Sequence, residues 1–120
     1  MVYYERRSLA AAESVFREAL ERLEALGRAD ATLGIVYSNL ADVLSARGDF
    51  ESARTLYSRS LDVQEKSVGT RNGQFAKTLE RFAQLLSKIH ANAEADSVAA
   101  RAKIIRAELS YTVSVAPAKR

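Results

Sequence analysis

Residues 48–61 of the chain read GDFESARTLYSRSL. The segment before them is amphipathic, with Tyr37, Leu40 and Leu44 three or four residues apart, which is the apolar spacing of a helix. Gly48 stands where that helix needs a residue with positive φ at its C-terminus, and Asp49 is a suitable N-terminal cap for the helix that follows. The stretch therefore predicts a tight turn between two helices.

Length and composition fit one globular domain. The chain has 120 residues, of which 48% are hydrophobic and 28% are charged, so disorder throughout is not expected. No apolar run reaches the roughly 18 residues of a membrane span, and the N-terminus has no apolar stretch of signal-peptide length. We therefore expect one cytoplasmic domain that has no contact with a membrane.

The chain is poor in catalytic and metal-binding residues. It has no cysteine and a single histidine, which excludes disulfides, thiolate metal sites and a cysteine nucleophile. No catalytic serine motif and no phosphate-binding glycine loop occurs. His90 occupies the place of a turn glycine, and histidine tolerates left-handed backbone better than most residues. We expect no enzyme activity, no metal site and no cofactor.

Charge is unevenly distributed. Residues 1–65 hold 8 basic and 11 acidic side chains, whereas residues 66–120 hold 10 basic and 4 acidic ones. This asymmetry fits solvated helix faces, and it also suits head-to-tail contact or an anionic partner. We do not expect nucleic acid as a partner, because residues 83–110 contain no aromatic side chain for base stacking.

Glycines and helix-forming residues divide the chain into helices. Gly27, Gly48 and Gly69 each follow an amphipathic stretch. The expected helices span residues 8–26, 31–47, 50–67, 74–89 and 92–110, after a short piece at 2–6 that can run on into the first of them. The expected caps are Asp30 and Asp49. Residues 111–120 are expected to form a flexible tail, although 111–115 alternate in the manner of a strand.

The sequence repeats with a period of 42 residues. A shift of 42 places superimposes identical residues at helix-packing positions: Gly27 on Gly69, Ala41 on Ala83, Leu44 on Leu86, Ser45 on Ser87, Ala53 on Ala95 and Arg59 on Arg101. A shift of 41 adds an earlier half unit, with Phe16 over Tyr57 and Leu20 over Leu61. Tyr37 and Tyr57 fall on packing positions and are expected in the core.

The repeat unit resembles the tetratricopeptide repeat, specifically the 42-residue type of kinesin light chains and many bacterial proteins. The resemblance rests on Leu40-Ala41 with Leu44, Phe82-Ala83 with Leu86, the turn Gly48-Asp49-Phe50 with Ala53, and the Leu-Tyr-x-Arg-Ser-Leu motif at 56–61. It covers about residues 2–110. Gly73 replaces the usual proline, His90-Ala91-Asn92 replaces the glycine turn of the last unit, and Ala99 replaces its aromatic residue.

This resemblance implies an all-α fold, a tetratricopeptide-repeat-like α-α superhelix (solenoid) of about two and a half helix-turn-helix repeats. The repeat domain would span residues 1–110, divided into a half repeat at 2–28 and repeats at 29–70 and 71–110. Val2-Tyr3-Tyr4 align with the end of a helix whose beginning is missing.

The resemblance also implies a protein–protein interaction scaffold whose concave groove binds a peptide or protein partner. The implied groove residues are Ile35, Ser38, Asn39, Asp42 and Ser45 from one unit and Lys77, Glu80, Arg81, Gln84 and Lys88 from the next. Asn39 can donate hydrogen bonds to a peptide backbone and accept them from it, and Lys77 with Arg81 could hold a carboxylate. Asn39, Lys77 and Arg81 match three of the five carboxylate-clamp positions of chaperone-binding relatives, but such residues are also common in this repeat generally.

The two ends of the stack suggest an alternative. The first helix, with Phe16 and Leu20, lacks most of its usual partner, and helix 92–110, with Val98, Ile104, Ile105 and Leu109, lacks a closing helix. Exposed apolar faces usually mark interfaces. The chain could therefore be a structural block that self-associates as a homo-oligomer or belongs to a larger repeat assembly.

Overall fold

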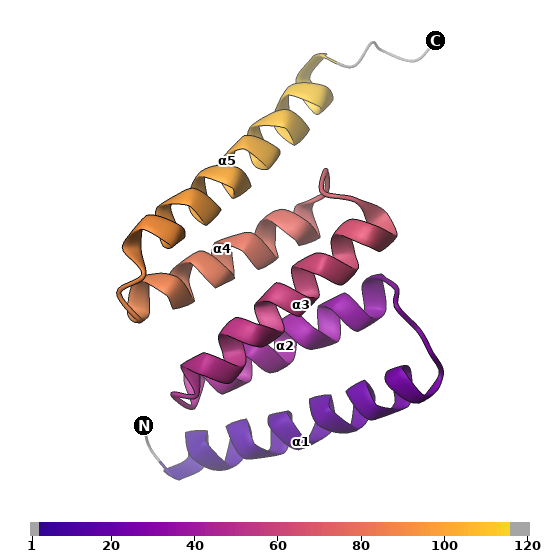
Figure 1. The fold of residues 1–120 in the computed structure, drawn as a ribbon, viewed down its shortest axis with the longest axis vertical. Coiled ribbons are helices and arrows are strands. Elements are labelled where there is room, and N and C mark those ends of the chain that lie inside the picture. Colours follow the sequence, from indigo (N-terminus) through magenta and orange to yellow (C-terminus); the bar gives the residue numbers. More distant parts are fainter. Residues whose placement is uncertain (1–2, 116–120) are drawn as a thin grey trace.

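Five helices follow one another as antiparallel neighbours in a stack (Figure 1). The computed structural model describes residues 3–115, with side chains described for residues 6–111, and within these ranges it contains no strand. The helices are α1 (Tyr3–Ala25), α2 (Ala31–Ala46), α3 (Phe50–Val68), α4 (Gly73–Lys88) and α5 (Asn92–Val115). Helices α2 and α3 form one tightly packed pair and α4 and α5 form the next, so the expected all-α repeat architecture is present.

Side-chain caps begin the helices where the sequence indicates. Asp30 accepts hydrogen bonds from the backbone N–H groups of Thr32 and Leu33, and Asp49 accepts one from Ser52, which confirms both predicted caps. Asn72 caps α4 by accepting from the Phe75 N–H at 2.8 Å, a cap that the sequence analysis did not assign.

A residue with positive φ ends each of the first four helices. Gly27, Gly48 and Gly69 have φ of 67°, 89° and 81°, and His90 has φ of 64° at the equivalent turn. His90 therefore adopts the left-handed backbone that its position predicted, in place of the glycine that the turn favours.

The two chain ends differ from the expected helix boundaries. The pieces expected at 2–6 and 8–26 form the single helix α1, because no glycine or proline interrupts residues 3–25; Val2 lies outside the described residues. Helix α5 continues to Val115, so 111–115 are helical and form neither tail nor strand. The β-branched residues there cost only tenths of a kcal/mol each in a helix, and the first strong helix breaker is Pro117. The rest of the expected tail, 116–120, is outside the described residues.

Small residues allow the helices to approach closely, and aromatic residues fill the spaces beside them. Ala41 and Ala53 are fully buried where α2 meets α3. Tyr57 of α3 packs on Phe82 of α4 with ring centroids 5.6 Å apart. Tyr37 and Tyr57 are 7% and 2% exposed, which confirms that both belong to the core.

A buried polar junction links α2, α3 and α4. The Ser60 hydroxyl donates to the Gly34 carbonyl oxygen at 2.6 Å, and the Gln64 amide donates to Ser60 Oγ and Thr78 Oγ1 at 2.9 and 3.0 Å. Gln64 lies against Gly34 so closely that a Cβ added there would be 2.7 Å from Gln64 Cγ. Gly34 is thus required by the space that a buried neighbour occupies, although its helical backbone would suit any residue.

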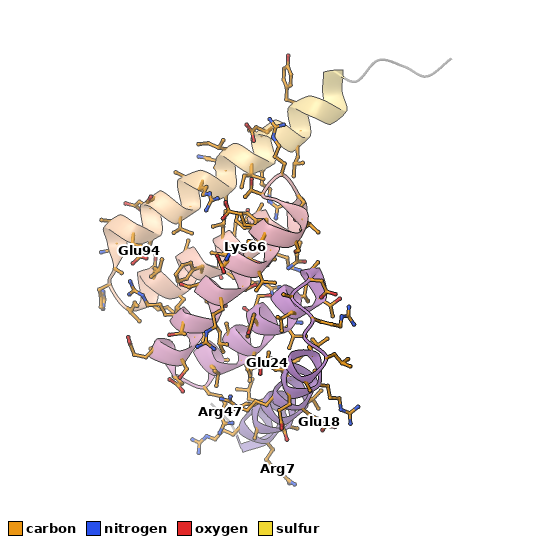
Figure 2. The ribbon with its side chains drawn as sticks, turned by 45° about the vertical axis from the view of Figure 1, so that its right-hand side comes forward. Arg7, Glu18, Glu24, Arg47, Lys66 and Glu94 are labelled. Carbon is orange, nitrogen blue, oxygen red and sulfur yellow. The ribbon has the colours of Figure 1, made fainter. Side chains whose placement is uncertain are left out.

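Charged side chains surround the outside of the stack, as Glu18, Lys66 and Glu94 show in Figure 2. Three ion pairs join residues four positions apart on one helix: Glu13–Arg17 and Glu18–Arg22 at 2.8 Å, and Asp62–Lys66 at 3.2 Å. Further pairs cross between helices, with Arg47 bound to Glu13 and Arg54 to Glu94. Exposed pairs of this kind contribute roughly 0–1 kcal/mol each, so packing dominates stability.

Replacing Gly34 by alanine should destabilise the protein by up to about 2 kcal/mol. Overpacking a core costs roughly 1–3 kcal/mol, and the better helix propensity of alanine recovers at most about 1 kcal/mol. Gly73→Ala is the matched control, because the atom nearest to its added Cβ is Arg106 Nη1 at 3.9 Å. Urea unfolding measures both variants.

The double variant Gly34→Ala with Gln64→Ala tests the cause. If Gln64 causes the clash, the double variant loses less stability than the sum of the two single variants. Additive losses, or equal effects of the two glycine substitutions, would contradict the steric explanation.

Candidate functional site

Helices α2 and α4 each place a row of side chains at three- or four-residue spacing on one face. Five of the expected groove residues meet around one hollow of about 240 Å³: Asp42 and Ser45 from α2, and Arg81, Gln84 and Lys88 from α4. Ala46, Tyr57 and Leu85 complete its lining, so three helices contribute to it.

The carboxylate of Asp42 is the centre of this hollow. It accepts a hydrogen bond from the Tyr57 hydroxyl of α3, and it forms an ion pair with the guanidinium of Arg81 on α4. Burial, together with the hydrogen bond to the Asp42 carboxylate, raises the pKa of the Tyr57 hydroxyl. Tyr57 thus remains a neutral donor, and the three side chains join three helices.

This arrangement changes the role expected of Arg81. The sequence suggested that Lys77 and Arg81 together could hold a carboxylate, but the Arg81 guanidinium is already bound to the carboxylate of Asp42. Lys77 and Lys88 are exposed, and neither forms an ion pair with the residues that the structure describes. They are the cations of this face that a ligand can reach without displacing an internal partner.

Two of the expected groove residues lie elsewhere. Ser38 is 1% exposed, and its hydroxyl donates to the Ile35 carbonyl oxygen at 3.0 Å, so it is part of the core. Glu80 is directed to α5, where Arg106 binds it through two hydrogen bonds of 2.9 Å. Hydrogen bonding to Arg106 lowers the pKa of the Glu80 carboxyl.

The remaining three continue the rows beyond the hollow. Ile35 is 37% exposed, Asn39 is half-buried and Lys77 is exposed. Their spacing from Asp42 and Arg81 places them on the same faces of α2 and α4. The groove face therefore consists of Ile35, Asn39, Asp42 and Ser45 of α2 and Lys77, Arg81, Gln84 and Lys88 of α4.

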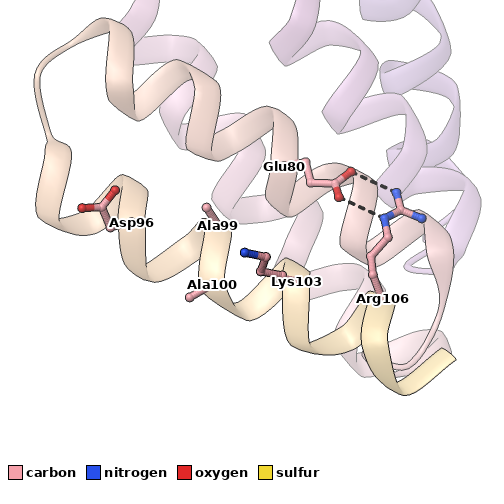
Figure 3. A pocket seen from close by; sticks show the side chains of 6 residues that line it. All are labelled: Glu80, Asp96, Ala99, Ala100, Lys103 and Arg106. Carbon is pink, nitrogen blue, oxygen red and sulfur yellow. Dashed lines mark hydrogen bonds and ion pairs between the residues drawn. The ribbon is translucent and has the colours of Figure 1, made fainter. Parts of the chain in front are cut away.

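A second hollow of about 540 Å³ lies between α4 and α5 (Figure 3). Its lining residues are Glu80, Asp96, Ala99, Ala100, Lys103 and Arg106. Ala99 is the repeat equivalent of Tyr57, 42 positions later, so this hollow lacks the bulky ring that Tyr57 supplies on α3. Figure 3 shows Ala99 on the side of α5 that faces α4, with Arg106 reaching across to Glu80. The absence of an aromatic residue at 99 was the sequence signal for this hollow.

Metal binding and membrane insertion both find no support in the described part of the chain. No three His, Cys, Asp or Glu side chains there lie close enough together to hold a metal ion. None of the helices there has the length and apolarity needed to cross a membrane.

Comparison with known proteins identifies the repeat. A family model described as tetratricopeptide repeat matches residues 1–66 and, in a second register, residues 32–103. None of the curated proteins matches the chain.

Removing the Tyr57 hydroxyl should reduce the loss of stability at alkaline pH. Because the folded-state pKa of Tyr57 is raised, its contribution to stability is complete below the unfolded pKa of about 10 and declines as the pH rises above it. Between pH 8 and about pH 11, the free energy of unfolding of Tyr57→Phe should fall by about 1 kcal/mol less than that of the wild type. Urea unfolding at the two pH values measures this difference.

Tyr111→Phe is the control, because Tyr111 is 68% exposed. This variant should show the alkaline decline of the wild type. An equal decline in Tyr57→Phe would show that the buried hydroxyl does not contribute to it.

Proposed function

The chain belongs to the tetratricopeptide-repeat family, whose members are generally protein–protein interaction modules, and on that premise we propose that it is a non-enzymatic scaffold that binds a peptide or protein partner along the groove face. The observation that carries the proposal is the hollow at Asp42, where side chains from three helices meet beside exposed polar and basic residues. A rigid face of this kind loses little conformational entropy on binding.

The charges of the groove face favour an acidic segment as ligand. The face has three cations, Lys77, Arg81 and Lys88, against the single carboxylate of Asp42. Since Asp42 neutralises Arg81, the two exposed lysines account for the remaining positive charge. They lie eleven residues apart on α4, about 16 Å at 1.5 Å per residue, which suits an extended peptide lying along the helix.

A carboxylate clamp is the narrower version of this proposal. Asn39, Lys77 and Arg81 stand at three of its five positions, but Arg81 would have to leave Asp42 to bind a ligand carboxylate. We favour the less specific role, in which Asn39 and Gln84 contact the peptide backbone and the lysines attract its acidic side chains.

Three finer proposals accompany this one. The 42-residue period and the Gly48-Asp49-Phe50 turn support repeats of the kinesin light-chain type. The helix pairs support a division into a half repeat at 2–28 and repeats at 29–70 and 71–110. We also propose a cytoplasmic location.

A second candidate function is a structural block that self-associates through its exposed helices. Val15 of α1 and Leu26, just after α1, are 63% and 71% exposed, and Ile104 and Tyr111 of α5 are 59% and 68% exposed. Of the apolar residues expected at the end of the stack, Ile105 is buried and Val98 and Leu109 are half-buried, so Ile104 is the exposed one.

Titration of the ¹⁵N-labelled chain with a peptide of eight glutamates tests the groove. Backbone amide signals of Ser45, Gln84 and Lys88 should shift, and the double variant Lys77→Ala, Lys88→Ala should bind about tenfold more weakly, because two exposed charge contacts are lost. A peptide of eight lysines should not bind there.

The matched control is the double variant Lys66→Ala, Lys103→Ala, which removes two lysines outside the groove face. It has the same net charge as the double variant of the groove face. It should retain most of the affinity. Equal losses in the two double variants, or signal shifts confined to α3 and α5, would contradict binding at the groove face.

A further inference from the structure

Helix α5 carries an exposed apolar stripe on the side opposite its buried face. The stripe consists of Ala93, Ser97, Ala100, Ile104, Ala107 and Tyr111, which are all exposed. Their spacing alternates between four and three residues, which is the heptad spacing of a coiled-coil seam. The residues that attach α5 to the core, such as Ala95, Ala102 and Ile105, point the other way.

The repeat itself shows that the fold does not require this stripe. The equivalent positions, 42 residues earlier, are Glu51, Thr55, Ser58, Asp62 and Glu65 of α3 and Gly69, which follows that helix. Helix α3 therefore presents a polar, solvated surface where α5 presents an apolar one containing Ile104 and Tyr111. The two helices have the same place in the repeat, but their outward surfaces differ in polarity.

Apart from Ala100, which also lines the second hollow, the stripe is distinct from the surface on which a further repeat would stack. Tyr57, Leu61 and Gln64 are the α3 residues that contact α4. Their equivalents on α5 are Ala99, Lys103 and Arg106, which line the second hollow together with acidic residues. On α5 the surface that corresponds to the stacking surface of α3 is therefore charged. The apolar stripe of α5 suits a different contact.

The charges beside the stripe indicate what covers it. With Ala93, Ala100 and Ala107 at the d positions of the heptads, Asp96 and Lys103 occupy g positions, and Arg101 and Glu108 occupy e positions. In a parallel pair of helices, each g residue faces the e residue five positions later on the other helix. Asp96 would then face the partner's Arg101, and Lys103 would face the partner's Glu108.

The antiparallel arrangement has the opposite electrostatics. In the register that overlaps the whole stripe it pairs e with e and g with g, so Arg101 would face the partner's Arg101 and Lys103 the partner's Lys103. Like charges at such positions are destabilising, whereas opposite charges select the partner and its orientation. In the single chain Arg101 lies over the Phe75 ring and Glu108 pairs with Arg71 at 3.6 Å, so both side chains are held at this edge of α5.

We propose that two copies of the chain associate through the α5 stripe, with the two α5 helices parallel. This inference specifies the surface for the self-association described above and does not depend on the groove proposal, because no groove residue belongs to the stripe. The alanines at the d positions allow close approach of the helices, and Ile104 and Tyr111 supply most of the apolar area. One helix against another buries less than a standard interface, so we expect a dissociation constant in the micromolar range.

Sedimentation velocity at concentrations from about 5 to about 500 μM tests association. The wild type should move from the 13.2 kDa chain mass toward twice that value. Ile104→Glu should raise the dissociation constant at least about tenfold, because it buries a charge. Val15→Glu on α1 is the matched control, since Val15 and Ile104 are 63% and 59% exposed.

A wild type that remains monomeric at the highest concentration would overturn the proposal and leave the stripe to a helix of another protein. Association lost in Val15→Glu and kept in Ile104→Glu would overturn it in favour of α1. Ile104→Glu should still bind the glutamate peptide, so a failure here is distinguishable from a failure of the groove proposal.

Single cysteines test the orientation without interference, because the chain has none of its own. In a parallel pair, Ala100→Cys should form an intermolecular disulfide with itself on mild oxidation. Ser58→Cys, the equivalent position on α3, is the control and should remain monomeric. Cross-linking of Ala100→Cys only when it is mixed with Ile104→Cys would show antiparallel helices and would overturn the parallel arrangement.

Discussion

Tyr57 joins three helices at one point, and it lines the hollow of the groove face. Its ring fills the space between α3 and α4 against Phe82, and its hydroxyl binds the α2 carboxylate that also holds Arg81. Tyr57 therefore holds α2, α3 and α4 together beside the groove face. In the next repeat Ala99 stands in its place and lines the hollow between α4 and α5.

The two repeats use one backbone plan for different surfaces. Packing positions are nearly interchangeable, as Ala53 and Ala95 or Leu44 and Leu86 show, since the distance between helices fixes their size. The outward positions have no such constraint, and there the two repeats differ. Asp62 of α3, for example, corresponds to Ile104 of α5. Differences between equivalent exposed residues are therefore more informative about contacts with other molecules than the shared core is.

Much of the fold was predictable, because local rules determine it. Periodicity and caps place α2, α3 and α4 to within one residue of their observed ends, and the left-handed turn at His90 follows from its alignment with Gly48. The site was less predictable. The pairing of Asp42 with Arg81 joins residues 39 positions apart, and the direction of Glu80 toward Arg106 depends on how α5 packs. Helical spacing shows which face a side chain is on, but it does not identify its partner on another helix.

The position of α1 at the edge of the stack has a consequence for how the protein opens. Among the described side chains of α1, Leu23 alone is buried, and its packing neighbour along the chain is α2. A helix with so few buried side chains opens at a low free-energy cost, so α1 can detach while the better-packed helices remain folded. Amide hydrogens of α1 should therefore exchange with solvent well before those of α2 and α4, which makes the first helix a separately opening unit.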